Sequence, residues 1–208
     1  MAIRIALAGN PNCGKTTMFN ALTGANQYVG NWPGVTVEKK EGKLKSKKVK
    51  EEVVVTDLPG IYSLSPYTLE EVVSRDYLLK GNPDVIVDLV DATNIERNLY
   101  LTTQMIETGI PVVIALNMAD LLAKRGIKID IERLSMLLDC PIVETSALKG
   151  EGLDKLIDEA IKTAKKKEAD LPKEIFNKDL EDAVSAAAEV LPSSIDANKI
   201  PGEGLQGC

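Results

Sequence analysis

The sequence contains no histidine, which removes the commonest metal ligand and general base from any chemistry the chain performs. Its three cysteines, Cys13, Cys140 and Cys208, lie far apart and form no Cys-x-x-Cys pair. This spacing indicates neither a disulfide framework nor a zinc site, and it fits a reducing compartment such as the cytosol. Any catalysis must therefore rely on other groups.

Long apolar runs are also missing, since none approaches the roughly 20 residues that a membrane-spanning helix needs. The N-terminal MAIRIALAG lacks the architecture of a signal peptide. Acidic residues outnumber basic ones, 31 to 25, which argues against a surface built to neutralise nucleic-acid phosphates. We therefore expect a soluble chain with no nucleic-acid partner, and we interpret the Lys-rich run at 43–50 as a solvated hairpin.

Short β-branched runs alternate with amphipathic helical patterns, which is typical of an α/β fold with a mostly parallel sheet. We expect six strands with helices on both faces. The segment 37–56 interrupts the alternation and indicates two strands joined by the Lys-rich turn, giving one antiparallel edge strand. The other expected strands lie at 3–9, 53–57, 84–91, 111–117 and 141–145, and the helices begin at about Lys15 or span 69–80, 95–108, 130–138 and 152–166.

The C-terminal part of the sequence differs in character from the rest. A charged stretch with a proline at 165–174 indicates a boundary. One amphipathic helix beyond it cannot bury its own apolar face, so it must dock elsewhere. The apolar positions that recur there at helical spacing are Ile175, Leu180, Val184, Ala187, Val190 and Leu191.

The first expected strand leads into GNPNCGKT, Gly9 to Thr16, which fits the pattern G-x-x-x-x-G-K-[ST]. In such a loop the backbone N–H groups and the following helix N-terminus cradle anionic oxygens. Lys15 then reaches the β- and γ-phosphates, and the Thr16 hydroxyl ligates Mg²⁺. The alternative, a Gly-rich turn without a ligand, is disfavoured because a strand precedes the motif and a helix follows it.

A carboxylate ends the strand VVVTD, and the tetrapeptide DLPG follows the phosphate loop in chain order. Asp57 is placed to hold Mg²⁺ through water. Gly60 lets the backbone approach a γ-phosphate closely. In isolation DLPG would be read as a plain turn; after a phosphate loop it predicts the magnesium side of a nucleotide site.

Two further short motifs indicate which base is bound. Asp120 in NMAD can accept from N1–H and the N2 amino group of guanine, donors that adenine does not present there. Asn117 can bond N7 and brace the loops, and Ala147 in SAL can donate its N–H to guanine O6. Four motifs in order, each at the carboxyl end of a strand, predict a guanine-nucleotide binder.

With these residues in hand, the chain resembles the small-GTPase (Ras-like) fold of the P-loop NTPases. More narrowly, it resembles the cytosolic G domain of the ferrous iron transport protein B (FeoB) family. The resemblance rests on GNPNCGKTTMFNALTG, on VGNWPGVTVEKKEG at 29–42, on DLPGIYSL, and on NMAD in place of the commoner NKxD. Met118 replaces the usual lysine, but an unbranched side chain can still pack beside the base.

The resemblance implies a GTP-binding G domain at 1–166 and a partial, truncated helical spacer segment at 167–208. It also implies a GTPase with Mg²⁺ as cofactor that regulates a membrane iron(II) permease domain of the same full-length polypeptide. Such a domain would work at the cytoplasmic face of a prokaryotic cell membrane, and a homo-oligomer is a further partner that the resemblance allows.

By the same resemblance, 25–40 is switch I, and Thr36 bonds Mg²⁺ and the γ-phosphate only in the GTP state. The expected Mg²⁺ ligands are Thr16, Thr36 and Asp57. The full nucleotide-binding set comprises Gly9, Asn10, Pro11, Asn12, Cys13, Gly14, Lys15, Thr16, Thr17, Gly34, Val35, Thr36, Asp57, Leu58, Pro59, Gly60, Asn117, Met118, Asp120, Ser146, Ala147 and Leu148.

Ile61 stands where Ras-like GTPases carry a glutamine that orients the attacking water. Hydrolysis must then be slow, or another group must order the water. The backbone around Thr36 is the better candidate, and Glu70 and Glu71 come next.

Asn12 offers a way to supply the missing positive charge. Similar GTPases use this asparagine to ligate K⁺, with switch I carbonyls, here from Gly30 and Trp32, completing the site. Asn12, Lys15 and Thr36 are the expected catalytic residues. The alternatives are that Asn12 only stabilises its loop and that Trp32 is a packing anchor.

Two other functions remain open from the residues alone. A ribosome- or tRNA-associated GTPase shares this type of phosphate loop, but it would carry an appended basic RNA-binding domain. A switch-type module that holds GTP and barely hydrolyses it is compatible with Ile61. Single-turnover hydrolysis separates such a module from a working enzyme.

Overall fold

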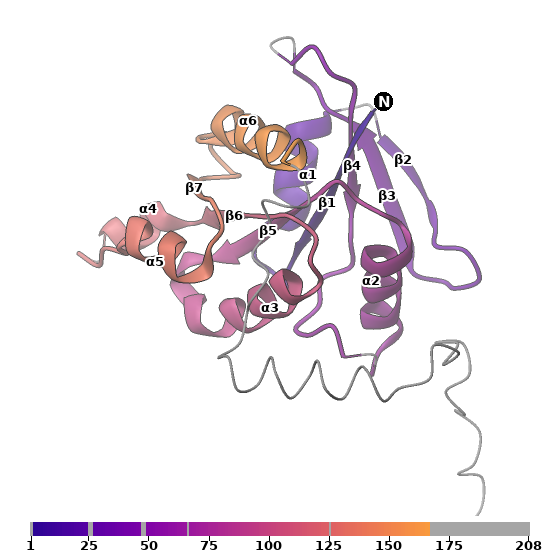
Figure 1. The fold of residues 1–208 in the computed structure, drawn as a ribbon, viewed down its shortest axis with the longest axis horizontal. Coiled ribbons are helices and arrows are strands. Elements are labelled where there is room, and N and C mark those ends of the chain that lie inside the picture. Colours follow the sequence, from indigo (N-terminus) through magenta and orange to yellow (C-terminus); the bar gives the residue numbers. More distant parts are fainter. Residues whose placement is uncertain (1, 25–26, 47–48, 66, 125, 167–208) are drawn as a thin grey trace, which may run out of the picture. The chain divides into compact units, whose positions relative to one another are not determined.

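The computed structural model describes residues 2–24, 27–46, 49–65, 67–124 and 126–166, and the helical segment expected at 167–208 lies outside these ranges. The described residues contain a seven-stranded sheet in the order β2-β3-β4-β1-β5-β6-β7 (Figure 1). Its strands are β1 Ile3–Gly9, β2 Gln27–Asn31, β3 Glu38–Lys43, β4 Val53–Asp57, β5 Val85–Asp91, β6 Val112–Asn117 and β7 Ile142–Thr145.

The strands from β4 to β7 in this order run parallel, and β3 is antiparallel to both β2 and β4. The expected α/β fold, mostly parallel with an antiparallel edge region, is confirmed. The expectation of six strands is wrong, because β2 forms within 25–40, the segment assigned to switch I, where no strand was expected. Its residues pair with β3 in the register Gly30↔Lys39, so the antiparallel strand lies one position inside the edge. Since β2 has exposed or half-buried residues throughout, its apolar pattern is weak.

The helices start and end where local chemistry favours it. The Thr68 hydroxyl accepts from the Glu71 N–H, and the Glu71 carboxylate accepts from the Thr68 N–H, a capping box that starts α2. Asp130 is the N-cap of α5, where its carboxylate accepts from the Arg133 N–H. The elements are α1 Lys15–Thr23, α2 Leu69–Lys80, the 3₁₀ turn η1 Ala92–Asn94, α3 Ile95–Glu107, α4 Ala119–Lys124, α5 Ile131–Leu138 and α6 Leu153–Ala164.

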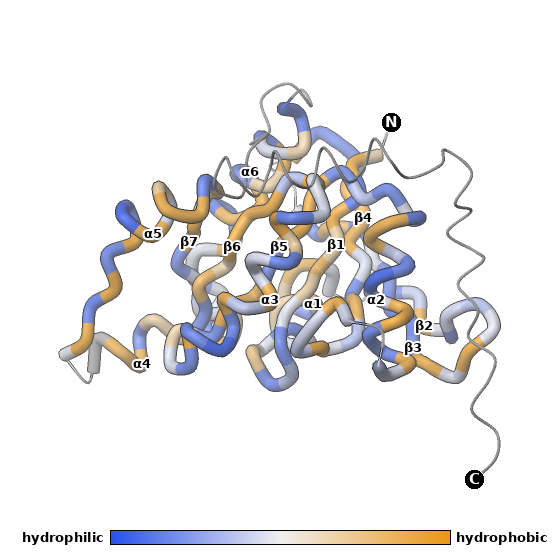
Figure 2. The backbone as a smooth tube through the Cα atoms, turned by 60° about the horizontal axis from the view of Figure 1, so that its bottom comes forward, coloured by the Kyte–Doolittle hydropathy of each residue, from blue (hydrophilic) through white to orange (hydrophobic). Residues whose placement is uncertain are grey.

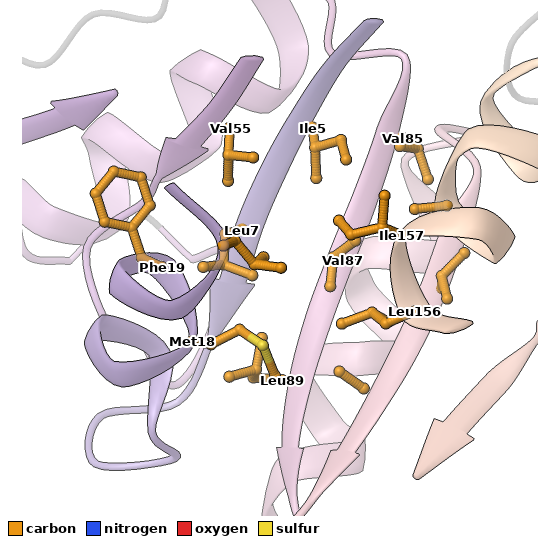
Figure 3. Close-up of a cluster of buried hydrophobic side chains, with 14 of the residues drawn as sticks. Ile5, Leu7, Met18, Phe19, Val55, Val85, Val87, Leu89, Leu156 and Ile157 are labelled. Carbon is orange, nitrogen blue, oxygen red and sulfur yellow. The ribbon is translucent and has the colours of Figure 1, made fainter. Parts of the chain in front are cut away.

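Side chains of the central strands alternate between two apolar layers. Ile5 and Leu7 of β1 face the layer covered by α1 and α6, where Phe19 and Ile157 pack against them (Figure 3). Ala6 and Ala8 face the opposite layer, under α2 and α3. Figure 2 shows the hydrophobic residues concentrated along these strands. Each fully buried Leu, Ile or Phe contributes about 1.5–3 kcal/mol, so these layers fix the sheet on which the site is built.

The parallel strands bring the ends of β1, β4, β5, β6 and β7 to one edge of the sheet, where ligands of open α/β sheets bind. The loops after β1, β4, β6 and β7 hold the motifs singled out above. Within the described ranges, no helix has the length and apolarity needed to cross a membrane.

Candidate nucleotide-binding site

The phosphate loop joins the end of β1 to the start of α1 and is held in an unusual backbone conformation. Asn12 has φ 67° and Gly14 has φ 95°, the left-handed region. A Cβ on Gly14 would lie 2.5 Å from Asn117 Nδ2, so only glycine fits beside that loop. The loop surrounds a pocket of about 450 Å³ lined by Asn10, Pro11, Asn12, Gly14, Lys15, Thr16, Thr17 and Gly60.

The remaining loop residues lie behind this pocket. A Cβ on Gly9 would lie 2.6 Å from the Leu89 carbonyl oxygen, so no larger residue fits between β1 and β5 at this position. Cys13 is buried, and its burial raises the pKa of the thiol to about 12, which leaves it neutral and unreactive.

Lys15 and Asp57 form an ion pair within the site, with 2.7 Å between Lys15 Nζ and Asp57 Oδ1. Their side chains are only 10% and 7% exposed. Burial raises the pKa of the Asp57 carboxyl, and the Lys15 ammonium opposes that rise. The Lys15 ammonium, which is expected to bind phosphate, and the Asp57 carboxylate, which is expected to bind Mg²⁺, therefore neutralise each other in this structure.

The residues expected to hold Mg²⁺ fit that ion in part. Thr16 lines the phosphate pocket, and the Asp57 carboxylate lies beside Lys15, which also lines it. A hydroxyl and a carboxylate are oxygen donors of the kind Mg²⁺ prefers. Thr36 is exposed and is absent from the lining of the pocket, so the structure does not bring the third expected ligand to the other two.

Asn117 joins the phosphate loop to the loop that follows β7. Its Nδ2 donates to the Cys13 carbonyl at 2.9 Å, and its Oδ1 accepts from the Ala147 N–H at 3.0 Å. Both bonds are buried, so they order the loops strongly. The Ala147 N–H that we expected to reach guanine O6 is used within the protein in this structure.

Asp120 lies at the start of α4, and its Oδ2 is 2.7 Å from Lys149 Nζ. The hydrogen bond from this ammonium to Asp120 raises the pKa of Lys149. The sequence reasoning missed Lys149, although its place directly after Ser146-Ala147-Leu148 was a usable signal. Met118, at φ 63°, packs beside the phosphate loop, with its Cε 3.8 Å from where a Gly14 Cβ would lie.

The expected switch I residues lie apart from the phosphate pocket. Gly30 of β2 pairs with Lys39 of β3, and the Trp32 carbonyl accepts from the Val35 N–H at 3.3 Å. Among the described residues that line the pocket, none comes from 30–36. The structure thus does not bring the Gly30 and Trp32 carbonyls to Asn12, nor Gly34 to the phosphate side.

The Trp32 side chain is 8% exposed and packs edge-on against Tyr77, with ring centroids 5.2 Å apart and an interplanar angle of 68°. It belongs to the apolar layer that also contains Leu58, Ile61 and Val73. Of the two readings of this residue, the side chain therefore has the role of a packing anchor.

The segment after Asp57 is held by contacts to the end of β1 and to α3. Ile61 is 3% exposed in the layer beside Trp32, and its N–H donates to the Gly9 carbonyl at 3.3 Å. The Arg97 guanidinium lies 4.1 Å from the Tyr62 ring centroid, a cation–π contact from α3. Ile61 is thus a core residue, and Glu71, one of the alternatives for ordering water, is engaged in the α2 cap.

Three features meet at the strand ends of a Ras-like sheet: a phosphate cradle, a buried carboxylate beside its lysine, and the loops after β6 and β7, which we call the base-side loops. Together they define a P-loop GTPase domain. The family model described as "Ferrous iron transport protein B" matches residues 3–160. The chain belongs to this family, FeoB.

Curated relatives and solved structures agree with that assignment. The Fe(2+) transporter FeoB of Shigella flexneri is 43% identical over 211 residues, which cover 98% of this chain and 26% of the relative. The Fe(2+) transporter FeoB of Salmonella typhimurium is 49% identical over 158 residues, 74% of this chain and 20% of the relative. The chain thus spans about a quarter of the length of such relatives.

A GDP-bound mutant of S. thermophilus NFeoB is 53% identical, with a TM-score of 0.83. The match covers 92% of this chain and 73% of the chain in that structure. The apo cytosolic domain of the T. maritima FeoB iron transporter is 45% identical, with a TM-score of 0.76. The match covers 80% of this chain and 66% of the chain in that structure.

Proposed function

We propose that this chain binds GTP and GDP together with Mg²⁺ and hydrolyses GTP to GDP and phosphate. The observation that carries the proposal is the buried Lys15–Asp57 pair beside the phosphate pocket. A lysine and an aspartate so placed are the two charges that a nucleotide–magnesium complex needs. The GDP-bound solved relative supports the same assignment.

Each named residue has a chemical task in this proposal. The backbone of the phosphate loop cradles the β-phosphate, and Lys15 turns from Asp57 to the phosphate oxygens. Thr16 and Asp57 would hold Mg²⁺, which would supply positive charge beside the phosphates. Asp120 accepts the two guanine donors, while Asn117 keeps the two base-side loops in register. Thr36 closes over the triphosphate from switch I.

Slow hydrolysis and stimulation by K⁺ belong to the same proposal. Ile61 is buried, so it neither orients water nor donates to the γ-phosphate. Asn12 lines the phosphate pocket in a left-handed conformation, where its amide oxygen can ligate a cation beside the phosphates. Gly30 and Trp32 would join Asn12 only after switch I leaves its present place.

The proposed setting is the cytoplasmic face of a prokaryotic membrane, with this domain regulating an iron(II) permease domain of the same polypeptide. Its support is that the relatives are Fe(2+) transporters, of which this chain matches one part. Iron is the cargo of that permease in this proposal, and the described residues contain no group of three or more cysteine, aspartate or glutamate side chains that could hold a metal ion. Nothing in the structure favours the ribosome- or tRNA-associated alternative.

Calorimetric titration of GDP, GTP and ATP tests the nucleotide assignment. We expect GDP and GTP to bind in the micromolar range and ATP to bind far more weakly. Asp120→Asn should weaken GDP binding by about a hundredfold, because one of the two hydrogen bonds is replaced by a donor facing a donor and the other loses its charged acceptor, and should shift preference toward xanthosine diphosphate. Asp158→Asn, an exposed change on α6, serves as the matched control. Equal affinity for ATP and GTP would contradict the proposal.

A further inference from the structure

The loop after β7 is a small closed turn that presents Lys149 to the opposite base-side loop. Ser146 and Glu151 exchange both backbone hydrogen bonds, at 3.1 and 3.2 Å, and the Lys149 N–H donates to the Ser146 carbonyl at 3.1 Å. A Cβ on Gly152 would lie 2.2 Å from the Glu144 carbonyl oxygen, so the turn is packed tightly against β7. The backbone that carries Lys149 is therefore well fixed.

From this turn the Lys149 ammonium reaches the Asp120 carboxylate at 2.7 Å. A second bond between the same two loops joins the Ala147 N–H to Asn117 Oδ1. Two groups expected to face guanine, the Asp120 carboxylate and the Ala147 N–H, thus have partners inside the protein. The base-side loops are closed on each other.

We propose that Lys149 acts as a counter-ion that holds the Asp120 carboxylate in the nucleotide-free protein and competes with guanine for it. The inference rests on the proposed guanine-nucleotide binding and names a residue that sets its affinity. Guanine presents two donors side by side, so it needs both carboxylate oxygens. An ammonium on Oδ2 takes acceptor capacity that the base requires.

The ammonium can leave at small cost. Lys149 is 47% exposed and Asp120 29%, so water replaces part of their attraction. Glu151 also faces Lys149 and raises its pKa, which gives the departing ammonium a second carboxylate nearby. Competition of this strength corresponds to about a two- to fivefold change in affinity.

Removing the Lys149 charge should change GDP affinity in the direction opposite to that expected from electrostatic attraction alone. Removing a lysine near an anionic ligand ordinarily weakens binding, because the positive potential falls. If Lys149 competes with the base, Lys149→Met should instead strengthen GDP binding by about two- to fivefold at low salt. Lys155→Met on α6 is the matched control, since it removes the same charge from an exposed position on the next element.

The experiment is calorimetric titration of GDP with Mg²⁺ into the parent, Lys149→Met and Lys155→Met proteins. The gain from Lys149→Met should shrink between about 0.05 M and about 0.5 M salt, because an exposed ion pair is screened. In an Asp120→Asn background titrated with xanthosine diphosphate, Lys149→Met should give no gain. Equal or weaker GDP binding by Lys149→Met, or the same gain in the Asp120→Asn background, would overturn the inference. Failure of the parent to bind GDP at all would overturn the proposed function as well.

Discussion

The Lys15 ammonium and the Asp57 carboxylate lie 2.7 Å apart, almost out of contact with solvent, at the point where phosphate and magnesium would meet. Each charge is thereby stabilised by the other, and neither is left unpaired in an environment of low dielectric. In the proposed function, nucleotide binding would exchange this one pair for two, a lysine with phosphate and an aspartate with Mg²⁺.

Asp57→Asn should lower the stability of the nucleotide-free protein and increase the stabilisation that GDP provides. The change leaves the Lys15 charge buried without its partner, so the nucleotide-free protein should lose about 3 kcal/mol of unfolding free energy. GDP supplies phosphate oxygens to Lys15 even in EDTA, so it should raise the melting temperature more in the variant than in the parent. Thermal unfolding in EDTA, with and without GDP, measures this; an unchanged melting temperature without nucleotide would mean that the pair contributes nothing.

Thr36→Ala should separate the two nucleotide states. Thr36 is exposed and lies outside the phosphate pocket, so the change should leave stability and GDP affinity nearly unchanged. GTP hydrolysis should fall, because the hydroxyl engages only the triphosphate and its magnesium. Phosphate release and GDP titration give the two readouts. A parallel loss of GDP affinity would show that Thr36 has a structural role.

Ile61→Ala should affect folding more than chemistry. The side chain is 3% exposed among Trp32, Leu58 and Val73, so truncation should cost about 3 kcal/mol of stability. The hydrolysis rate of the folded fraction should change by well under the roughly hundredfold expected when a transition-state contact is removed. Urea unfolding and single-turnover hydrolysis test the two parts; a hundredfold loss of rate in a stable variant would contradict this division.

Replacing KCl by NaCl at equal ionic strength tests the cation. If Asn12 ligates K⁺ beside the phosphates, hydrolysis should be slower in NaCl, because a smaller ion would draw the switch I carbonyls inward. Asn12→Ala should remove the difference between the salts and keep most of the GDP affinity, since the loop backbone still cradles the phosphates. Identical rates in both salts for the parent would rule the ion out and direct attention to Glu70.

A buried carboxyl in β5 that does not line the phosphate pocket makes stability depend on pH. Asp88 in β5 is 1% exposed, and burial raises its pKa to about 7, against a hydrogen bond from the Thr102 hydroxyl at 2.5 Å that lowers it. The Cys140 thiol, with a pKa raised to about 12, stays neutral throughout. The folded protein therefore binds a proton that the unfolded chain has already released between about pH 4 and pH 7.

Stability should thus fall as the pH rises through that range, by on the order of 4 kcal/mol, and level off above it. Asp88→Asn should flatten the profile, because the amide does not titrate. Thr102→Val removes the hydrogen bond that lowers the pKa and should extend the fall to higher pH. Urea unfolding from pH 5 to 8 measures all three proteins, and a parent profile that is flat or rises would contradict the assignment.

Much of the fold could be read from the sequence because buried parallel strands are continuous apolar runs. VVVTD and PVVIALN give β4 and β6 to within a residue, and the phosphate loop needs a glycine at 14 for a reason that the structure makes explicit. The edge strand β2 escaped detection because its side chains are exposed on an edge and carry no alternating pattern.

The site was predictable as a set of motifs, while its connections were not. The place of Lys149 directly after Ser146-Ala147-Leu148 puts it near the site, but the sequence does not say that it meets Asp120, since that contact depends on the path of two loops. The same holds for Trp32, whose apolar surroundings come from α2 and from the segment after Asp57. Chain order indicates which residues share an edge of the sheet, and side-chain packing decides which of them meet.

Trp32 is the sole tryptophan of the 208 residues, and it lies in the segment assigned to switch I. Its indole is buried against Tyr77 and beside Leu58, Ile61 and Val73, with the Lys39 ammonium 5.2 Å from the ring centroid, so its fluorescence reports on these surroundings. While switch I keeps its present place, the emission is that of an indole in apolar surroundings. If switch I moves to the phosphates, as proposed, the ring would leave this apolar layer for water and the emission would shift to longer wavelength. The chain therefore contains its own optical label for the position of its switch.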